Sequence, residues 1–332
     1  MTINFPEYIC DARRLWVGEA MPSPPLVLID LDRTGEWPDE VTLPPCPVVG
    51  FGDAAHPLAA RLDVVVEAPV SVAGVVRGVL AAPVAAGVVV QCLRILPEMT
   101  VEAGLVAESM AYGLLQGGAE HRAWLAGRGP LHHPADGVGE DFELGRILAE
   151  RHDDVLEVTF DRAEAGNAVD VAMRDALREL FAAAALDETI ARIHLRGAGR
   201  SFCLGAELAE FGTMRDGAMA HSVRQLTLPA PMIARVAARM TAHIQGACVG
   251  AGLEMAAFAA RVTAERGAWF QLPELAMGLI PGAGGCVSVS RRIGRQRTAL
   301  MVLSGRRISA EVALGWGLID AISSDETGAD EG

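Results

Sequence analysis

The sequence predicts an α/β protein whose core is a largely parallel sheet or a β-superhelix. Strand and helix signals alternate between residues 155 and 317, at the rhythm typical of parallel strands joined by helices. Hydrophobic residues make up 51% of the 332 residues, so the chain can bury a large core, in two domains or in one large one.

The second part of the chain carries the clearest signals for individual elements. Val155–Phe160 reads VLEVTF, which is typical of a strand. Asp170–Leu186 has apolar residues at helical spacing, and Asp170 is the expected N-cap. Two further strands are predicted at residues 191–197 and 260–266. A helix that leads into a strand is predicted at residues 230–252, and a helix at residues 252–260. Two helices that end at glycine are predicted at residues 291–305 and 309–317.

The first part has the same mixed character. Strands are predicted at residues 25–33 and 62–70, and one helical run at residues 102–128. Residues 64–90 are rich in Val and Ala, but charged residues and prolines interrupt them, so buried strand and helix are favoured over a membrane span. The Gly-, Pro- and His-rich stretch near residues 127–141 is typical of a linker.

These signals predict a division of the chain. The expected parts are a first region at 1–128, a linker at 129–141, a catalytic core at 142–322 and an acidic, disordered tail at 323–332.

Composition excludes several classes of protein. The formal net charge of −14 argues against nucleic acid as a partner, because phosphate backbones require a basic surface. All 28 basic residues are arginine.

The six cysteines occur singly, which favours reduced thiols and no metal site. The first twenty residues lack the apolar segment of a signal peptide, so we expect a soluble cytoplasmic protein.

Two loops of small residues could carry chemistry. One lies in Gly199–Gly212 (GRSFCLGAELAEFG) and the other in Ala247–Ala257 (ACVGAGLEMAA), each before a predicted helical turn. Backbone N–H groups at such turns are unpaired and point outward. If both loops meet around one carbonyl oxygen, they form an oxyanion hole.

Two glutamates accompany these loops. Glu254 lies in the first turn of the helix after the second loop, and Glu274 follows Pro273. A carboxylate pair beside an oxyanion hole suits proton transfer next to an activated carbonyl. The alternative for Glu254 is simple compensation of the helix dipole.

Five segments of the second part together resemble the crotonase (enoyl-CoA hydratase/isomerase) superfamily. They contain the motifs GNAVD, SFCLGAEL, GACVGAGLEMA, LPELAMGLIPGAGG and SGRRISAEVALGWGLID, and they lie at residues 161–181, 197–211, 243–264, 270–285 and 299–320. The resemblance implies a crotonase-like ββα superhelix that acts on acyl-CoA thioesters, with coenzyme A as part of the substrate and no separate cofactor.

The resemblance also implies roles for individual residues. The backbone N–H groups of Leu204 and Ala251 would form the oxyanion hole. Glu274 would exchange a proton at the α-carbon, and Glu254 would orient or activate water, as in hydratases. Isomerisation, hydrolysis or lyase chemistry in the same pocket is the second possibility, and a catalytically silent acyl-CoA-binding or structural subunit is the third. The implied contacts to coenzyme A and substrate are Ala163, Ala165, Ala168, Ala206, Glu207, Leu208, Gly250 and Pro273.

The chain departs from the family pattern at four positions. Leu204 replaces a usual alanine, Ala251 a glycine, Glu207 an aspartate and Ala163 a proline. At Ala251 the change is harmful if the backbone there needs a positive φ.

Family members continue past GLID into helices that cover the active site and build trimers or hexamers. Residues 83–128 resemble that helical region, and residues 46–67 faintly resemble the family core without its glutamates. We expect a degenerate crotonase-like half whose helices complete the pocket of the second half, in a homo-oligomer.

Arg291, Arg292, Arg295 and Arg297 form a basic cluster on a predicted helix. They could be a solvated face with acidic neighbours or a clamp for the phosphates of coenzyme A.

Overall fold

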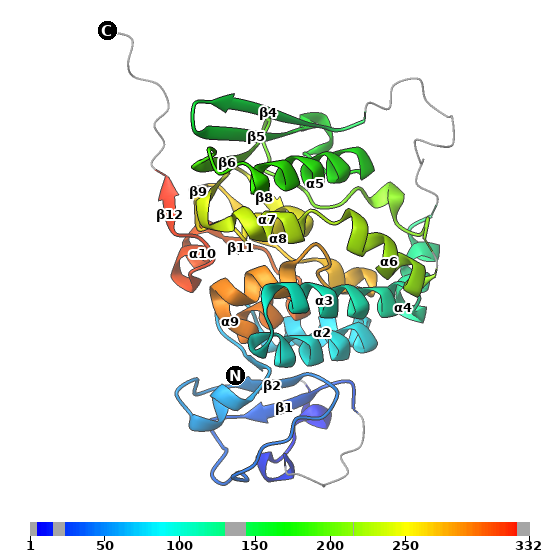
Figure 1. The fold of residues 1–332 in the computed structure, drawn as a ribbon. Coiled ribbons are helices and arrows are strands. Elements are labelled where there is room, and N and C mark those ends of the chain that lie inside the picture. The colour runs from blue at the N-terminus through cyan, green and yellow to red at the C-terminus, as the bar shows by residue number, and fades with distance from the viewer. Residues whose placement is uncertain (1–4, 16–23, 130–143, 215, 324–332) are drawn as a thin grey trace.

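The computed structural model describes residues 5–15, 24–129, 144–214 and 216–323 (Figure 1). The predicted linker and the acidic tail lie outside these residues, apart from Gly129 and Ser323.

A six-stranded sheet forms the top of the molecule in Figure 1, with strand order β12-β9-β7-β6-β5-β4. Only β4 runs antiparallel to its neighbour, and the other neighbours pair in parallel. The strands are β4 (Arg146–His152), β5 (Val155–Asp161), β6 (Arg192–Gly197), β7 (Met240–Ile244), β9 (Arg261–Glu265) and β12 (Ala321–Ser323). The predicted parallel α/β core is therefore present.

A second, three-stranded sheet lies beside it and carries the functional loops. Its order is β11-β10-β8, from β8 (Ala247–Val249), β10 (Trp269–Gln271) and β11 (Ile308–Ser309). The helices of this part are α5 (Val171–Leu186), α6 (Gly217–Thr227), α7 (Ala230–Val236), α8 (Ala251–Ala256), α9 (Gly285–Ser304) and α10 (Ala310–Trp316).

Local signals explain where several of these helices begin and end. The predicted cap of α5 is confirmed, because Asp170 Oδ1 accepts a hydrogen bond from Met173 N at 2.9 Å. Helix α9 begins at Gly285, earlier than predicted, and is kinked at Gly294, whose φ of 79° breaks the helical path.

The described residues of the first part form a small parallel sheet and four α-helices, together with short 3-10 helices. The sheet has the order β1-β2-β3 and forms the lower lobe in Figure 1. Its strands are β1 (Val27–Asp30), β2 (Val48–Phe51) and β3 (Val64–Val65), and the helices are α1 (Val72–Ala81), α2 (Pro83–Ile95), α3 (Val101–Gln116) and α4 (Ala119–Gly127). Val27 and Ile29 pack in a small cluster of the lobe, whereas Leu28 packs in the main core, so β1 is apolar on both faces.

Two predictions for the first part need correction. The single helical run expected at residues 102–128 is two helices, because Gly117 and Gly118 end α3 and start α4. The strand expected at residues 62–70 is limited to Val64 and Val65. Among the described residues, no single helix is long and apolar enough to cross a membrane. One pair of helices, Val72–Ala81 with Pro83–Glu98, is together long and apolar enough, but this is a matter of length and composition only, and the pair is bent by 111°.

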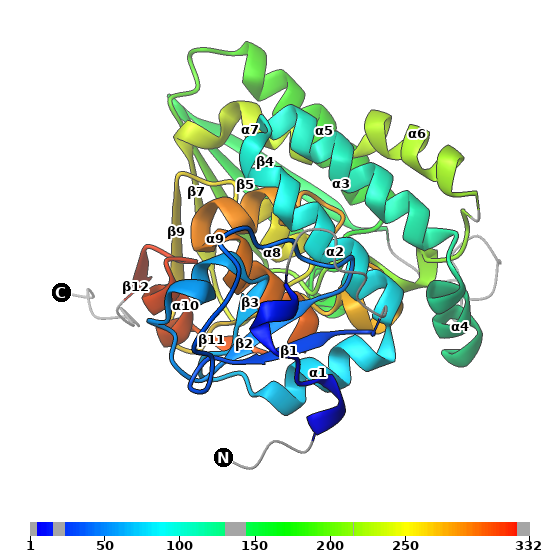
Figure 2. The same cartoon turned by 90° about the horizontal axis from the view of Figure 1, so that it is seen from below.

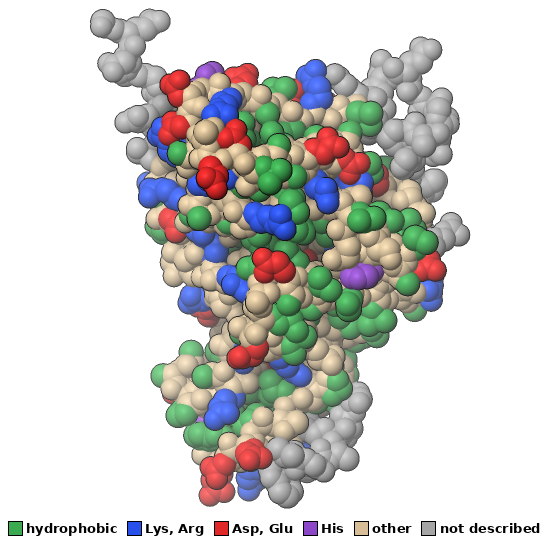
Figure 3. Space-filling model, in the orientation of Figure 1, with side chains coloured by type: hydrophobic (Ala, Val, Ile, Leu, Met, Phe, Trp, Pro, Cys, Tyr) green, Lys and Arg blue, Asp and Glu red, His purple; other side chains and the backbone are tan. Residues whose placement is uncertain are grey.

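The helices of the first part pack directly on the second part. Helices α1, α2 and α3 contact α9, and α3 also lies along α6 (Figures 1 and 2). One continuous core cluster includes Val75 of α1, Leu105 of α3 and Leu300 of α9. On the outer surface, hydrophobic side chains gather over α3 and α6 (Figure 3), where Met110, Leu114, Met219 and Leu226 are exposed.

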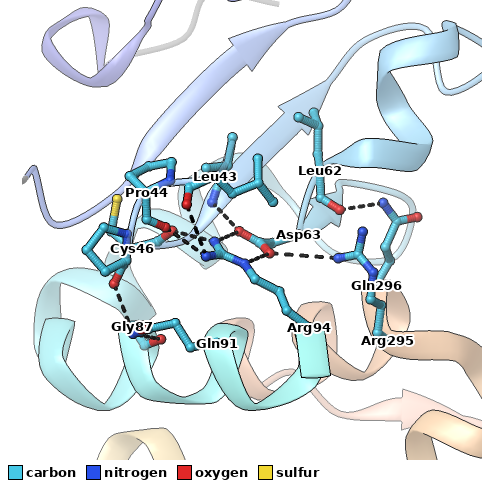
Figure 4. Close-up of polar contacts among 12 residues, drawn as sticks. Leu43, Pro44, Cys46, Leu62, Asp63, Gly87, Gln91, Arg94, Arg295 and Gln296 are labelled. Carbon is cyan, nitrogen blue, oxygen red and sulfur yellow. Dashed lines mark hydrogen bonds and ion pairs between the residues drawn. The ribbon is translucent and has the colours of Figure 1, made fainter. Parts of the chain in front are cut away.

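A buried ionic network joins the lower lobe to these helices (Figure 4). Asp63 is 1% exposed, and its carboxylate accepts bonds from Arg94 Nε at 2.8 Å, Arg94 Nη2 at 2.6 Å and Val48 N at 2.9 Å. Arg295 of α9 lies 3.7 Å from the same carboxylate, and Gln296 donates to the Leu62 carbonyl at 2.9 Å. The network therefore connects β2, the start of β3, α2 and α9.

Candidate active site

A cavity of about 530 Å³ lies between the two parts of the chain. Its walls come from α3, α4, the loop before α6, α6 itself, the start of α8 and residues 273–283. Nine of the twelve predicted site residues line it, namely Leu204, Ala206, Glu207, Leu208, Gly250, Ala251, Glu254, Pro273 and Glu274.

Three predicted contacts do not line this cavity: Ala163, Ala165 and Ala168. They lie in and after the short 3-10 helix Ala163–Ala165. Asn167, which has φ of 58°, fixes this loop by donating to the carbonyls of Ala198 and Ser201, both at 2.8 Å. The loop therefore stands next to the first glycine turn, outside the cavity wall.

The first glycine turn corrects one predicted role. Leu204 N donates to the carbonyl of Gly166 at 3.0 Å, so this N–H is already paired within the protein. Two residues later, Ala206 N has no acceptor among the described residues. This bond of Leu204 could not be predicted from the sequence, because it depends on a contact between separate segments.

The second glycine turn keeps its predicted donor. Ala251 is the first residue of α8, and its N–H has no acceptor in the described part of the chain. The positive φ of 47° belongs to Gly250, not to Ala251, so alanine is tolerated at this position. A β-carbon placed on Gly205 would lie 3.8 Å from Ala251 N, which shows that the two turns meet.

Glu254 is held in a defined orientation on the first turn of α8. It is 2% exposed, and its Oε2 accepts bonds from Ala283 N at 2.6 Å and Gly285 N at 2.8 Å. Burial raises its pKa to about 7, although these backbone bonds and the charge of Arg224 act in the opposite direction. Near neutral pH the carboxyl group can therefore both accept and release a proton.

Glu274 is buried beside it, and one of its carboxyl oxygens has no partner in the part of the chain that the structure describes. It begins the 3-10 helix Glu274–Met277 after Pro273, and its Oε2 has no hydrogen-bond partner among the described residues. Burial and the nearby charge of Glu254 raise its pKa well above the usual range. A protonated carboxyl group that faces a cavity is suited to donate a proton.

Several lining residues come from the first part of the chain and were not predicted. Tyr112, Gln116 and Trp124 reach the cavity from α3 and α4. Arg224 of α6 also lines it, with its guanidinium 4.0 Å from the centre of the Tyr112 ring. Tyr112 and Gln116 are four residues apart, so the sequence could have placed them on one face of a helix. Only the packing of α3 identifies that face as the one that meets the cavity.

The arginine cluster on α9 does not face the cavity. Arg292 pairs with Asp320 at 2.5 Å and Arg297 with Glu67 at 2.7 Å, while Arg291 donates to the Met99 carbonyl at 2.9 Å. These contacts favour the alternative of a face with acidic neighbours over the phosphate clamp, because the side chains join α9 to neighbouring segments and none lines the cavity. Among the described residues, no group of three or more His, Cys, Asp or Glu is placed to hold a metal ion.

Comparison with known proteins identifies the second part. Residues 150–331 match the sequence model of the Enoyl-CoA hydratase/isomerase family. A 2,3-dehydroadipyl-CoA hydratase of Escherichia coli (strain K12) is 34% identical over 191 residues, which cover 55% of this chain and 72% of that protein. A 1,2-epoxyphenylacetyl-CoA isomerase of the same organism is 32% identical, over 55% of this chain and 72% of that protein.

A solved structure agrees with the sequence matches. Pseudomonas aeruginosa DspI superimposes with a TM-score of 0.50 at 29% identity, over 57% of this chain and 77% of that one. The family match does not reach residues 1–149, so the degenerate crotonase-like origin of the first part stays a prediction. From its second part, the chain belongs to the enoyl-CoA hydratase/isomerase family.

Proposed function

We propose that this protein adds water to an α,β-unsaturated acyl-CoA thioester, or removes it in the reverse direction. One observation carries the proposal. Glu254 and Glu274, which come from separate turns, line one cavity beside two backbone N–H groups that have no acceptor among the described residues. The relatives named for reactions of acyl-CoA compounds support a thioester as the substrate.

The oxyanion hole in this proposal is formed by Ala206 N and Ala251 N. Both residues line the cavity, and their turns are in contact. Two N–H groups directed at the thioester oxygen stabilise the negative charge that develops there, and each such donor contributes about 3 kcal/mol in known cases. Leu204 N is excluded from this role by its bond to Gly166.

The two carboxyl groups divide the proton transfers. Glu254, with a pKa of about 7, accepts a proton from water as the water oxygen forms a bond to the β-carbon. The electron pair of the double bond moves to the thioester oxygen and gives an enolate held by the two N–H groups. Protonated Glu274 then donates its proton to the α-carbon. One molecule of water is added, and exchange of one proton with solvent restores both carboxyl groups.

The first part of the chain contributes to the same pocket. Tyr112, Gln116 and Trp124 line it, and Arg128 donates to the carbonyl of Phe211 at 2.7 Å. His121 forms a bond of 2.9 Å with the carbonyl of Met277, just after Glu274. These contacts support the expectation that α3 and α4 complete the site. The turn at residues 206–208 is the proposed contact to the pantetheine of coenzyme A.

The test is a panel of short, long and aromatic enoyl-CoA thioesters with product mass as the readout. The expected result is a gain of one water that is lost in both Glu254→Gln and Glu274→Gln. A shifted double bond at unchanged mass would indicate an isomerase instead, and release of coenzyme A a hydrolase or lyase. Thioesters that bind without any reaction would indicate a silent binding protein and contradict the proposal.

A further inference from the structure

Two buried carboxylates share the backbone amides at the start of α9. Glu254 Oε2 accepts from Ala283 N and Gly285 N, at 2.6 and 2.8 Å. Glu108 Oε1 accepts from Gly284 N and Glu108 Oε2 from Cys286 N, both at 2.8 Å. The four donors are consecutive in sequence and alternate between the two carboxylates. The orientation of Glu254 and the position of Glu108 therefore depend on one backbone segment, residues 283–286.

Glu108 reaches this segment from the first part of the chain. It lies on α3, is 1% exposed and does not line the cavity, so it does not contact the substrate there. One turn before it, Gly104 packs against Val287, since a β-carbon there would lie 3.0 Å from the Val287 side chain. One turn after it, the Tyr112 ring packs against Gly282. Helix α3 thus contacts residues 282–287 along one stripe, with Glu108 at its centre.

Loss of the Glu108 carboxylate would leave two buried donors without partners. Among the residues that the structure describes, Gly284 N and Cys286 N have no acceptor other than Glu108, and an unsatisfied buried donor costs about 1–3 kcal/mol. The segment would relax to satisfy them. Ala283 and Gly285, which orient Glu254, lie on either side of Gly284 and would move with it.

We propose that Glu108 is a positioning residue, which holds residues 283–286 so that Glu254 keeps its orientation in the cavity. This inference rests on the proposed role of Glu254 in catalysis. The first part of the chain then contributes to proton transfer without touching the reacting atoms, through a carboxylate that no motif of the second part contains.

The test compares Glu108→Gln with Glu102→Gln, a matched change on the exposed side of the same helix. Glutamine offers one acceptor oxygen, and its NH2 group would face a backbone N–H. In the full-length protein, hydrogen exchange of the Ala283 and Gly285 amides should become at least about tenfold faster in Glu108→Gln. The reason is that residues 283–286 are then no longer held in place by Glu108. In Glu102→Gln the exchange should equal that of the unmodified protein.

Kinetics on an enoyl-CoA substrate give the second readout. We expect kcat of Glu108→Gln to fall by about 10- to 100-fold, as for a small misplacement of a catalytic group, with KM changed by less than about threefold. In a Glu254→Gln background, where only the slow residual hydration is measured, the same substitution should lower that residual kcat by less than about twofold, because its effect passes through Glu254. A general loosening of the fold would lower kcat by the same factor in both backgrounds.

Unchanged exchange at Ala283 and Gly285 in folded Glu108→Gln, or equal loss of kcat in both backgrounds, would overturn the proposal. If Glu108→Gln does not fold, Glu108→Asp is measured by the same criteria, because it keeps the carboxyl group and shortens its reach. If the unmodified protein does not hydrate any thioester, the proposed function fails, and the exchange rates still decide whether Glu108 holds the segment.

Discussion

Gly250 lies directly against Glu274: a β-carbon on Gly250 would stand 2.7 Å from Glu274 Oε1. The backbone of Gly250 also has φ of 47°, a conformation that side chains disfavour. The turn that presents Ala251 N to the cavity therefore requires glycine for two reasons, the positive φ and the space taken by the carboxyl group.

Gly250→Ala should reduce activity strongly while the protein still folds. The added methyl group displaces Glu274 or the turn, and a displacement of about 1 Å at a reacting group lowers kcat by about 100-fold. The backbone strain should lower the free energy of unfolding by about 1–3 kcal/mol. Thioester turnover and denaturant unfolding measure the two effects. Gly267→Ala is the control, because nothing lies within 4 Å of its β-carbon position; equal kcat in both variants would contradict the argument.

The rate of hydration should depend on pH through Glu254. The carboxyl group accepts a proton from water only in its ionised form, and its pKa is raised to about 7. Below that pH, kcat/KM should rise about tenfold per pH unit, and it should level off above it. At higher pH it should fall again as Glu274, whose pKa is raised well above its usual range, loses its proton. Initial rates across the pH range measure this, and a flat profile from about pH 5 to 7 would exclude Glu254 as the base.

Arg94→Met should destabilise the fold through the lower lobe. It removes both short bonds to Asp63 and leaves a carboxylate that is 1% exposed without its main partner. Breaking a buried pair in this way lowers the free energy of unfolding by about 3–5 kcal/mol. Equilibrium unfolding in urea measures the loss.

The matched control for that prediction is Arg33→Met. Arg33 forms an exposed pair with Asp30 at 3.6 Å, and such surface pairs contribute about 0–1 kcal/mol. Similar losses in the two variants would show that the Asp63 network does not stabilise the fold as its burial indicates.

A chain that starts at residue 144 should be inactive. It lacks Tyr112, Gln116 and Trp124 from the cavity wall and Glu108 from the start of α9. It also exposes the faces of α9 that α1, α2 and α3 cover, so we expect aggregation at moderate concentration. Turnover and light scattering decide this; a soluble and fully active shortened chain would show that the first part does not complete the site.

The sequence by itself determined the elements of the second part that rest on local signals. The strand at β5, the cap of α5 at Asp170 and the position of Glu254 in a first helical turn agree with the structure. Such features depend on side-chain period, capping and glycine within a few residues, so they are visible in a linear pattern.

Tertiary structure alone decided which groups are available to the site. Leu204 N donates to the carbonyl of Gly166, whereas Ala206 N has no acceptor within the described ranges, although both lie in one predicted loop. The arginines of α9 bind neighbouring segments, and Glu108 reaches the amides of residues 284 and 286 from a helix of the first part. The physical reason is that a hydrogen bond between distant segments depends on how helices and turns pack, and packing involves contacts that no local spacing encodes.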